Sequence, residues 1–240
     1  MKIIISPSKK QNRNCVIERD FIKPFFETKS SQLRELLENF DKNELAEVLN
    51  IKGNLLDKTE KKYSAPKQYK AAICCYNGLV FKQLDINEYD IESINYMQNN
   101  LCILSAMYGV LTPLTAIEPY RLDMRSKIEG MDLYEYWQEE MDEIFLVEDL
   151  IINLASNEFS KMLKPENYKG RFITINFKEY NDKNKLRTVA ARAKKARGLM
   201  LNTMIKDQIE KLENLKKVEV LEYIYDSQMS SEDNLVFIRE

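Results

Sequence analysis

The densest positive charge in this sequence lies in residues 190–198. Arg192, Lys194, Lys195 and Arg197 fall within six positions, and no carboxylate interrupts them. Lys and Arg side chains bind phosphates without reading a base sequence, so this segment is a candidate anion or nucleic-acid site. A solvated helix face is the alternative, because charge runs usually have that role. In a chain whose net charge is −2, one concentrated basic segment is typical of a local anion site.

The same segment reads as a helix with one apolar stripe, at about 100° per residue. The stripe consists of Ala193, Ala196, Met200 and Met204. Three of the four cations lie on the opposite side. Arg197 flanks the stripe, so we expect it to be the cation that points inward.

A second basic cluster follows the first apolar run, where Lys9 and Lys10 are adjacent and Arg13 is close in sequence. The whole chain has 36 basic and 38 acidic side chains. A nucleic-acid role would therefore depend on local patches rather than on a global basic field. We expect the two basic segments to line one cleft.

Residues 118–125 place an aromatic side chain, two arginines and two carboxylates in one predicted loop. Loops that are dense in chemistry are more often functional than core segments. Arg121 can clamp an anion, because its guanidinium fork matches phosphate and carboxylate, and Arg125 adds a second cation. The alternative is a surface pair between Arg121 and Asp123, which would contribute little.

Small polar or flexible residues end four short apolar runs, at 2–5, 71–76, 101–104 and 150–154. Ligands of open α/β sheets bind beyond the carboxyl ends of parallel strands, so a shared pocket is one interpretation. Ordinary turns after strands use the same residue types, which is the other. The candidate pocket residues are Ser6, Ser8, Asn77, Ser105, Tyr108, Tyr120, Asn153 and Ser156. The two tyrosines can either stack on a base or pack inside a structural loop.

An enzyme acting on a nucleoside, nucleobase or nucleotide in this pocket is a second functional hypothesis. The chain contains no histidine, which excludes Ser-His-Asp triads, Cys-His dyads and HExxH zinc sites. Acid–base chemistry would then need a carboxylate, and Asp123 and Glu158 are the candidates. Glu158 is also explained as a favourable carboxylate in the first turn of a helix.

Glycine and cysteine spacing excludes further site types. No two of the six glycines are close enough for GxGxxG or for the GxxxxGK[ST] phosphate loop. The four cysteines, Cys15, Cys74, Cys75 and Cys102, form no CxxC pair, and adjacent cysteines on a strand point to opposite faces. We therefore predict free thiols, no metal site and no cofactor.

The elements indicate a single α/β domain over residues 1–240, with some α+β character. We expect a mostly parallel central sheet flanked by helices and an antiparallel addition near the C-terminus. Strands are predicted at 2–5, 71–76, 101–104, 150–154, 170–180, 185–189, 218–225 and 234–238, and helices at 30–40, 41–49, 54–63, 90–99, 132–145 and 190–209. The capping-box patterns Asp41-x-x-Glu44 and Asp132-x-x-Glu135 mark two helix starts.

The apolar start of the chain is too short for a signal peptide, and no run approaches the roughly 18–20 residues of a membrane span. We expect a cytoplasmic protein with no membrane partner.

Six motifs, in order over essentially the whole chain, resemble the YaaA family of bacterial peroxide-stress proteins. They are ISPSK (5–9), LSAMYGVLTPL (104–114), PYRLDM (119–124), DLYxxW (132–137), INLASNE (152–158) and AKKARGxM (193–200). Members of that family usually carry Ala, Thr and Gly where Ser8, Lys10 and Ala106 stand here.

The resemblance implies a cytoplasmic protein that binds DNA through a positively charged cleft and helps lower free iron under peroxide stress. It implies no established enzyme activity. It also implies a helix-hairpin-helix element, for which residues 105–111 around Gly109 are the candidate. The basic residues of the family carry over to Lys9, Arg121, Lys194, Lys195 and Arg197.

Two ligand classes are therefore expected: DNA of low sequence specificity, duplex or distorted, and a small nucleotide-like molecule. A bare interaction protein is a third option, and nothing in the sequence favours it.

Overall fold

The computed structural model describes residues 1–11, 15, 17, 19–66 and 68–240. The strands in these residues are β1 (Lys2–Ile5), β2 (Lys70–Ala71), β3 (Leu101–Ser105), β4 (Gly109–Leu111), β5 (Ala116–Ile117), β6 (Leu150–Asn153), β7 (Arg171–Tyr180), β8 (Leu186–Arg187), β9 (Ile224–Asp226) and β10 (Asn234–Arg239). The helices are α1 (Glu27–Asn39), α2 (Lys42–Leu49), α3 (Asn54–Ser64), α4 (Ala72–Cys75), α5 (Ile91–Asn100), α6 (Leu133–Tyr136), α7 (Gln138–Phe145), α8 (Asn157–Ser160), α9 (Ala190–Lys206) and α10 (Leu212–Leu215), with 3-10 turns η1 (Phe81–Gln83), η2 (Ile86–Glu88) and η3 (Pro165–Asn167).

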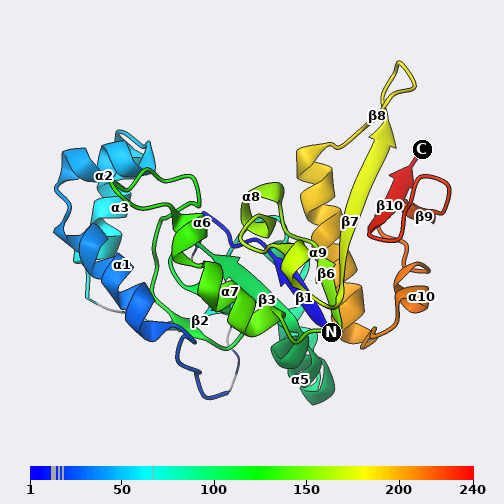
Figure 1. The fold of residues 1–240 in the computed structure, drawn as a ribbon, viewed down its shortest axis with the longest axis horizontal. Helices are drawn as coiled ribbons and strands as arrows, with labels where there is room; N and C mark the ends of the chain where they lie inside the picture. The colour runs from blue at the N-terminus through cyan, green and yellow to red at the C-terminus, as the bar shows by residue number, and fades with distance from the viewer. Residues whose placement is uncertain (12–14, 16, 18, 67) are drawn as a thin grey trace.

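Within the described residues, an eight-stranded sheet runs in the order β4-β3-β1-β6-β7-β10-β9, and β8 pairs with β7 (Figure 1). The five strands from β3 to β10 in this order are mutually parallel. Strands β4, β8 and β9 pair antiparallel with their neighbours. The predicted fold class is confirmed: a mostly parallel sheet with helices around it and antiparallel strands toward the C-terminus.

Strand β1 lies in the interior of the sheet, because it pairs with a neighbour along each of its two edges. Ile3 pairs with Leu101 on one side and with Ile152 on the other. The side chains of Ile3, Ile4 and Ile5 are fully buried. A parallel strand buried on both faces reads as a continuous apolar run, which is what the sequence has at this point.

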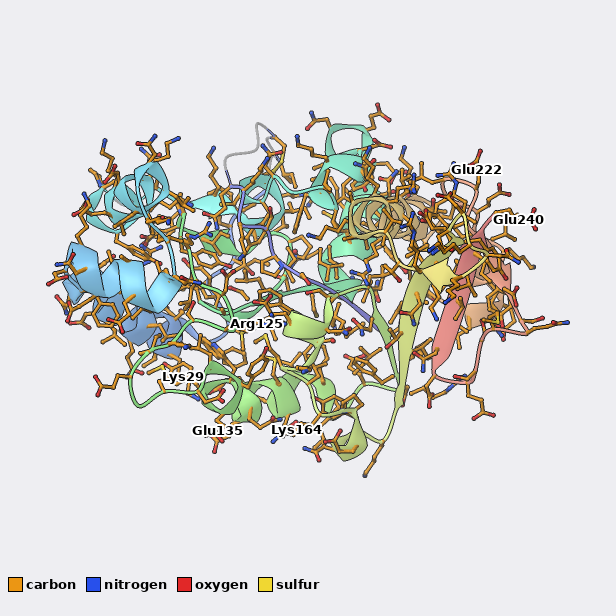
Figure 2. The ribbon with its side chains drawn as sticks, turned by 90° about the horizontal axis from the view of Figure 1, so that it is seen from above. Lys29, Arg125, Glu135, Lys164, Glu222 and Glu240 are labelled. Atoms are coloured by element: carbon orange, nitrogen blue, oxygen red, sulfur yellow. A yellow bond between two sulfur atoms is a disulfide. The ribbon has the colours of Figure 1, made fainter. Side chains whose placement is uncertain are left out.

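Helices cover both faces of the sheet. Seen from above, α5 and α9 lie on one side of the strands, and α6 to α8 lie on the opposite side, where Glu135 is labelled (Figure 2). Helices α1, α2 and α3 gather at one end of the molecule, on the left in Figure 1. The C-terminal strands β9 and β10 occupy the other end.

Both predicted capping-box patterns start helices, and the reciprocal capping box forms at Asp41 and Glu44. Asp41 Oδ1 accepts hydrogen bonds from the amides of Asn43 and Glu44, and Glu44 Oε2 accepts one from Asp41 N at 2.7 Å. Asp132 Oδ1 accepts from the amide of Tyr134 at 2.7 Å. The helix predicted at 132–145 is divided at Trp137, whose buried indole donates to a backbone oxygen.

The predicted strand at 71–76 is wrong. Lys70 and Ala71 pair with β5 in a separate ribbon, and Tyr76 makes an isolated bridge with Gln11. Residues 72–75 form the helical turn α4, and all of its side chains are buried. A short apolar run buried on every side gives no periodicity to separate a strand from a helix.

The segment around Gly109 is a β-hairpin and not a helix-hairpin-helix. Ser105 at the end of β3 pairs with Gly109 at the start of β4. Gly109 has φ +70°, and a Cβ at this position would lie 2.8 Å from Cε3 of Trp137. The glycine therefore serves a tight turn packed against an aromatic ring.

The prediction of four free thiols is wrong for two of them. Cys15 and Cys74 form a disulfide whose Cα atoms lie 5.3 Å apart. Cys75 and Cys102 have buried, reduced thiols. Because Cys74 and Cys75 lie on a helical turn and not on a strand, the argument from opposite strand faces does not apply to them.

None of the described helices has the length and apolar character that crossing a membrane requires.

Candidate functional site

The carboxyl ends of β1 and β6 meet as the strand pattern predicts. Ser6, directly after β1, donates its hydroxyl to Ser156 Oγ at 3.0 Å. The amide of Ser156 donates to Ser6 Oγ at 2.8 Å. These bonds join loops that are far apart in sequence and fix the edge of the sheet from which the next side chains project.

The turn at Asn77 and Gly78 lies against the loop that follows β1, although no sheet strand leads to it. Asn77 N donates to Lys10 O at 2.7 Å. A Cβ at Gly78 would lie 2.5 Å from Ser8 Oγ, so the Ser8 side chain occupies the space that a larger residue would need. Ser6, Ser8, Asn77 and Ser156 therefore lie at this edge of the sheet.

Ser105 and Tyr120 belong to a buried chain of hydroxyl groups. Tyr120 OH lies 2.8 Å from Ser105 Oγ and 2.8 Å from Tyr76 OH. The rings of Tyr108 and Tyr120 make a T-shaped contact with centroids 5.5 Å apart. Burial raises the pKa of Tyr120 and of Tyr108, so these phenols stay protonated.

Both tyrosine rings are buried, at 6% exposed for Tyr108 and 2% for Tyr120. This arrangement corresponds to the packed-loop interpretation, because the described surroundings leave neither ring open to a base.

Asn153 is buried as well, and its side chain forms hydrogen bonds within the protein. Its Nδ2 donates to Thr174 Oγ1 at 3.2 Å, and its Oδ1 accepts from Ala155 N at 2.9 Å.

A buried ion pair anchors the loop of residues 118–125. Arg34 Nη1 lies 3.2 Å from Glu118 Oε2, and Arg34 Nη2 donates to Pro119 O at 3.1 Å. Arg34 and Glu118 are 6% and 7% exposed. Sequence reasoning missed Arg34, because its position in an amphipathic helix gives no sign of a partner in a distant loop.

Helix α3 and Gln11 hold the same loop from the other side. Tyr63 OH donates to Arg121 O at 2.7 Å. Lys62 Nζ donates to Tyr120 O at 3.1 Å and to Gln11 Oε1 at 2.9 Å. Burial lowers the pKa of Lys62, and the charge of Arg121 lowers it further. These contacts fix the backbone from which Arg121 projects.

Asp123 pairs with Lys9 and not with Arg121. Lys9 Nζ lies 2.6 Å from Asp123 Oδ2, and the lysine side chain remains 59% exposed. Arg121 is half-buried, and its Nε is a buried donor without a hydrogen-bond partner among the described residues. Lys10 is exposed. Arg13 lies outside the described residues.

Helix α9 confirms the predicted stripe. Its members Ala193, Ala196, Met200 and Met204 are all buried, at 2% exposed or less. Lys194 and Lys195 are exposed, and no ion pair involves either of them in the described part of the chain. Arg197 is half-buried, which agrees with the prediction that it points inward.

Arg192 and Arg197 differ sharply although they share one helix. Arg192 Nη2 lies 2.5 Å from Glu179 Oε1, and this hydrogen bond raises the pKa of Arg192 and lowers the pKa of Glu179. Arg197 has a buried Nε without a hydrogen-bond partner among the described residues. Burial lowers the pKa of Arg197, and no described carboxylate offsets that effect.

Glu158 also has an unpartnered buried atom. Its Oε1 has no hydrogen-bond partner within the described residues, whereas its backbone oxygen accepts from Tyr134 OH at 2.9 Å. Burial raises the pKa of Tyr134, and the charge of Glu158 raises it further. A carboxylate oxygen with unused acceptor capacity can take a proton or a hydrogen bond from a ligand.

Arg125, labelled near the middle of the molecule in Figure 2, is exposed and lines a hollow of about 400 Å³. Other lining residues are Met124, Lys127, Ile128 and Tyr134. No three described His, Cys, Asp or Glu side chains come together as metal ligands.

Comparison with known proteins gives one family. The family model described as "Peroxide stress protein YaaA" matches residues 1–229. A UPF0246 protein of Fusobacterium nucleatum is 35% identical over 250 residues, which cover 100% of this chain and 99% of that protein. UPF0246 proteins of Francisella philomiragia and Rickettsia felis are 34% and 35% identical, with both chains covered in full.

Proposed function

The chain belongs to the peroxide stress protein YaaA family, and on that premise we propose that it binds DNA during peroxide stress in the cytoplasm. The contact surface is the α9 patch, which we define as Lys194, Lys195 and Arg197. The loops that carry Lys9, Lys10, Arg121 and Arg125 extend it. Bound protein shields DNA and so limits the damage that free iron causes under peroxide.

One observation carries this proposal: the Arg197 guanidinium is partly buried without a counter-charge. Its Nε has no hydrogen-bond partner in the described part of the protein, and burial lowers its pKa. Removing a cation from water costs several kcal/mol unless an anion compensates. A phosphate oxygen supplies that anion and accepts the unused hydrogen bond.

Arg121 strengthens the proposal because it has the same property on another element. Its Nε is also buried and without a partner among the described residues. Arg192, in contrast, already binds Glu179. We therefore assign Arg192 a structural role and exclude it from the DNA contact.

The helix-hairpin-helix that the family resemblance implies has a candidate in α2 and α3. The turn between them contains Asn50 at φ 48° and Gly53 at φ 57°, and Lys52 and Gly53 are exposed. Lys127 N donates to Val48 O at 3.2 Å, so α2 touches the loop that carries Arg125. We propose that amides of this turn contact a phosphate on the side of the molecule that carries Arg125.

DNA binding is tested with fluorescence anisotropy on a labelled duplex. The variant Lys194→Ala, Lys195→Ala, Arg197→Ala should lose at least about tenfold in affinity, because three phosphate contacts disappear. A charge-matched control replaces Lys211, Lys216 and Lys217, which flank α10, with Ala. Equal affinities of the two triple variants would contradict the proposed surface.

A small nucleotide-like ligand at the strand ends is a second candidate function. The unused Oε1 of Glu158 favours it, because a base amino group or a ribose hydroxyl can donate there. A thermal-shift screen with nucleosides, nucleotides and bases tests this candidate. Stabilisation that Glu158→Gln abolishes would support it, and no stabilisation by any compound would reject it.

A further inference from the structure

The disulfide between Cys15 and Cys74 joins the loop after β1 to helix α4. The two residues are 59 positions apart in sequence, and their Cα atoms lie 5.3 Å apart. That separation lies in the usual range for disulfides, so the bond closes without moving the backbone. The structure therefore represents the oxidised form of this cysteine pair.

The four cysteines differ in their access to a dissolved oxidant. Cys15 is half-buried, whereas Cys74, Cys75 and Cys102 are 4%, 1% and 4% exposed. Burial raises the pKa of Cys102 to about 12, so its thiol stays protonated. Because the thiolate is the reactive form, Cys102 is inert and Cys15 is the accessible position.

We propose that Cys15 and Cys74 are a dithiol site that hydrogen peroxide oxidises, with Cys15 as the attacked thiol and Cys74 as the resolving thiol. The Cys15 thiolate attacks peroxide, the O–O bond breaks, and a sulfenic acid and hydroxide form. The Cys74 thiolate then attacks the sulfenic sulfur and displaces hydroxide. Counting protons, two thiols and one peroxide give one disulfide and two waters.

The family description gives this chemistry an oxidant, because the matching family is one of peroxide stress. Disulfides in reducing compartments are usually transient and redox-sensing rather than structural. In such a compartment the reduced pair forms whenever peroxide is low. The redox state of this cysteine pair then reports the peroxide concentration.

Oxidation links Cys15 covalently to the helical turn that precedes the contacts of Lys10 and Gln11. Lys10 O accepts from Asn77 N at 2.7 Å, and Gln11 forms an antiparallel bridge with Tyr76. Gln11 Oε1 also accepts from Tyr120 N at 2.9 Å. The bond from Cys15 to Cys74 adds a covalent link close in sequence to the contacts that Lys10 and Gln11 make with residues 76–77. We infer that oxidation orders Lys9 and Lys10 for anion binding, a step that rests on the proposed function.

The dithiol itself is tested without DNA. The full chain is reduced under native conditions, titrated with hydrogen peroxide, and assayed for free thiols and for crosslinked peptides by mass spectrometry. Wild type should lose two of four thiols per peroxide and give a Cys15–Cys74 crosslink. Cys102→Ser should lose two of its three thiols at the same rate, whereas Cys15→Ser should keep its three.

Four results would overturn the dithiol: retention of all four thiols at excess peroxide, a Cys15–Cys75 crosslink instead, equal thiol loss in Cys15→Ser, or a disulfide that cannot be reduced in the folded protein. Melting temperatures of each variant identify any that fail to fold. In that case Cys15→Ala and Cys74→Ala replace the serine variants.

The effect of oxidation on DNA binding is measured separately, as the affinity for a labelled duplex. Oxidised wild type should bind a labelled duplex about two- to fivefold more tightly than reduced wild type, and Cys15→Ser should show no redox effect. Crosslinking without a change in affinity would reject the coupling and leave the dithiol in place. Failure of the proposed function would appear separately, as equal DNA affinity of the α9-patch variant and its control.

Discussion

Lys9 Nζ and Asp123 Oδ2 lie 2.6 Å apart and join the loop after β1 to the loop of residues 118–125. The two loops belong to different motifs of the sequence and meet at the carboxyl edge of the sheet. Among the described residues, Asp123 is the only acidic side chain that forms an ion pair with Lys9, and it neutralises the charge of that lysine. Asp123 therefore reduces the positive charge next to Arg121.

Replacing Asp123 with Asn should increase DNA affinity by about two- to fivefold at low salt, because Lys9 becomes an uncompensated cation. Stability should change by less than about 1 kcal/mol, since the lysine is mostly exposed and such pairs contribute little. Fluorescence anisotropy measures the DNA affinity, and urea unfolding measures the change in stability. Weaker DNA binding would mean that Asp123 positions Lys9 instead of competing with the phosphate.

Replacing Arg34 with Met should destabilise the protein by about 3–5 kcal/mol, because Glu118 would remain buried without its charged partner. The pair Arg34→Met, Glu118→Gln should recover much of that loss. Urea unfolding of both variants measures the difference. A single variant as stable as wild type would show that the Glu118 carboxylate does not depend on Arg34 for its compensation.

Replacing Gly198 with Ala should destabilise the protein by about 1–2 kcal/mol, although Ala favours a helix by about 1 kcal/mol. A Cβ at Gly198 would lie 2.4 Å from Val80 O, so α9 must move away from η1. Thermal unfolding shows directly whether Gly198→Ala stabilises or destabilises the protein. A higher melting temperature would mean that η1 moves away from α9 without a loss of stability.

The ion pair between Arg192 and Glu179 should make stability depend on pH. The hydrogen bond from Arg192 lowers the pKa of Glu179 below its ordinary value of 4.5. A carboxyl with a lowered folded pKa contributes stability above that ordinary value and loses it as pH falls through the folded pKa. The stability difference between wild type and Glu179→Gln should therefore be constant near neutral pH and shrink below about pH 4.5. A difference that grows in acid would contradict this assignment.

Elements with a strong local pattern could be predicted from the sequence. The stripe of α9 follows from the spacing of Ala193, Ala196, Met200 and Met204, and the start of α2 follows from its capping box. The central strands β1, β3 and β6 follow from their continuous apolar runs. In each case one segment contains the whole signal.

Contacts between distant segments could not be predicted. Nothing in α1 indicates that Arg34 binds Glu118, and nothing around Cys15 indicates Cys74, because these pairs arise only when the chain folds. The helical turn α4 is not predictable for a related reason: its apolar residues are buried by tertiary contacts on every side. The burial of Tyr108 and Tyr120 likewise depends on the path of the 118–125 loop.

The most direct test of the account is the salt dependence of DNA affinity for wild type and Arg197→Gln, with Arg197→Lys as the charge-conserving control. If Arg197 binds a phosphate, its loss should reduce the slope of log K against log salt by about 0.9, and Arg197→Lys should keep most of the slope. The measurement covers about 50 to 200 mM salt, where phosphate contacts dominate the change. Identical slopes and affinities for wild type and Arg197→Gln would contradict the claim that this half-buried arginine is the anion site.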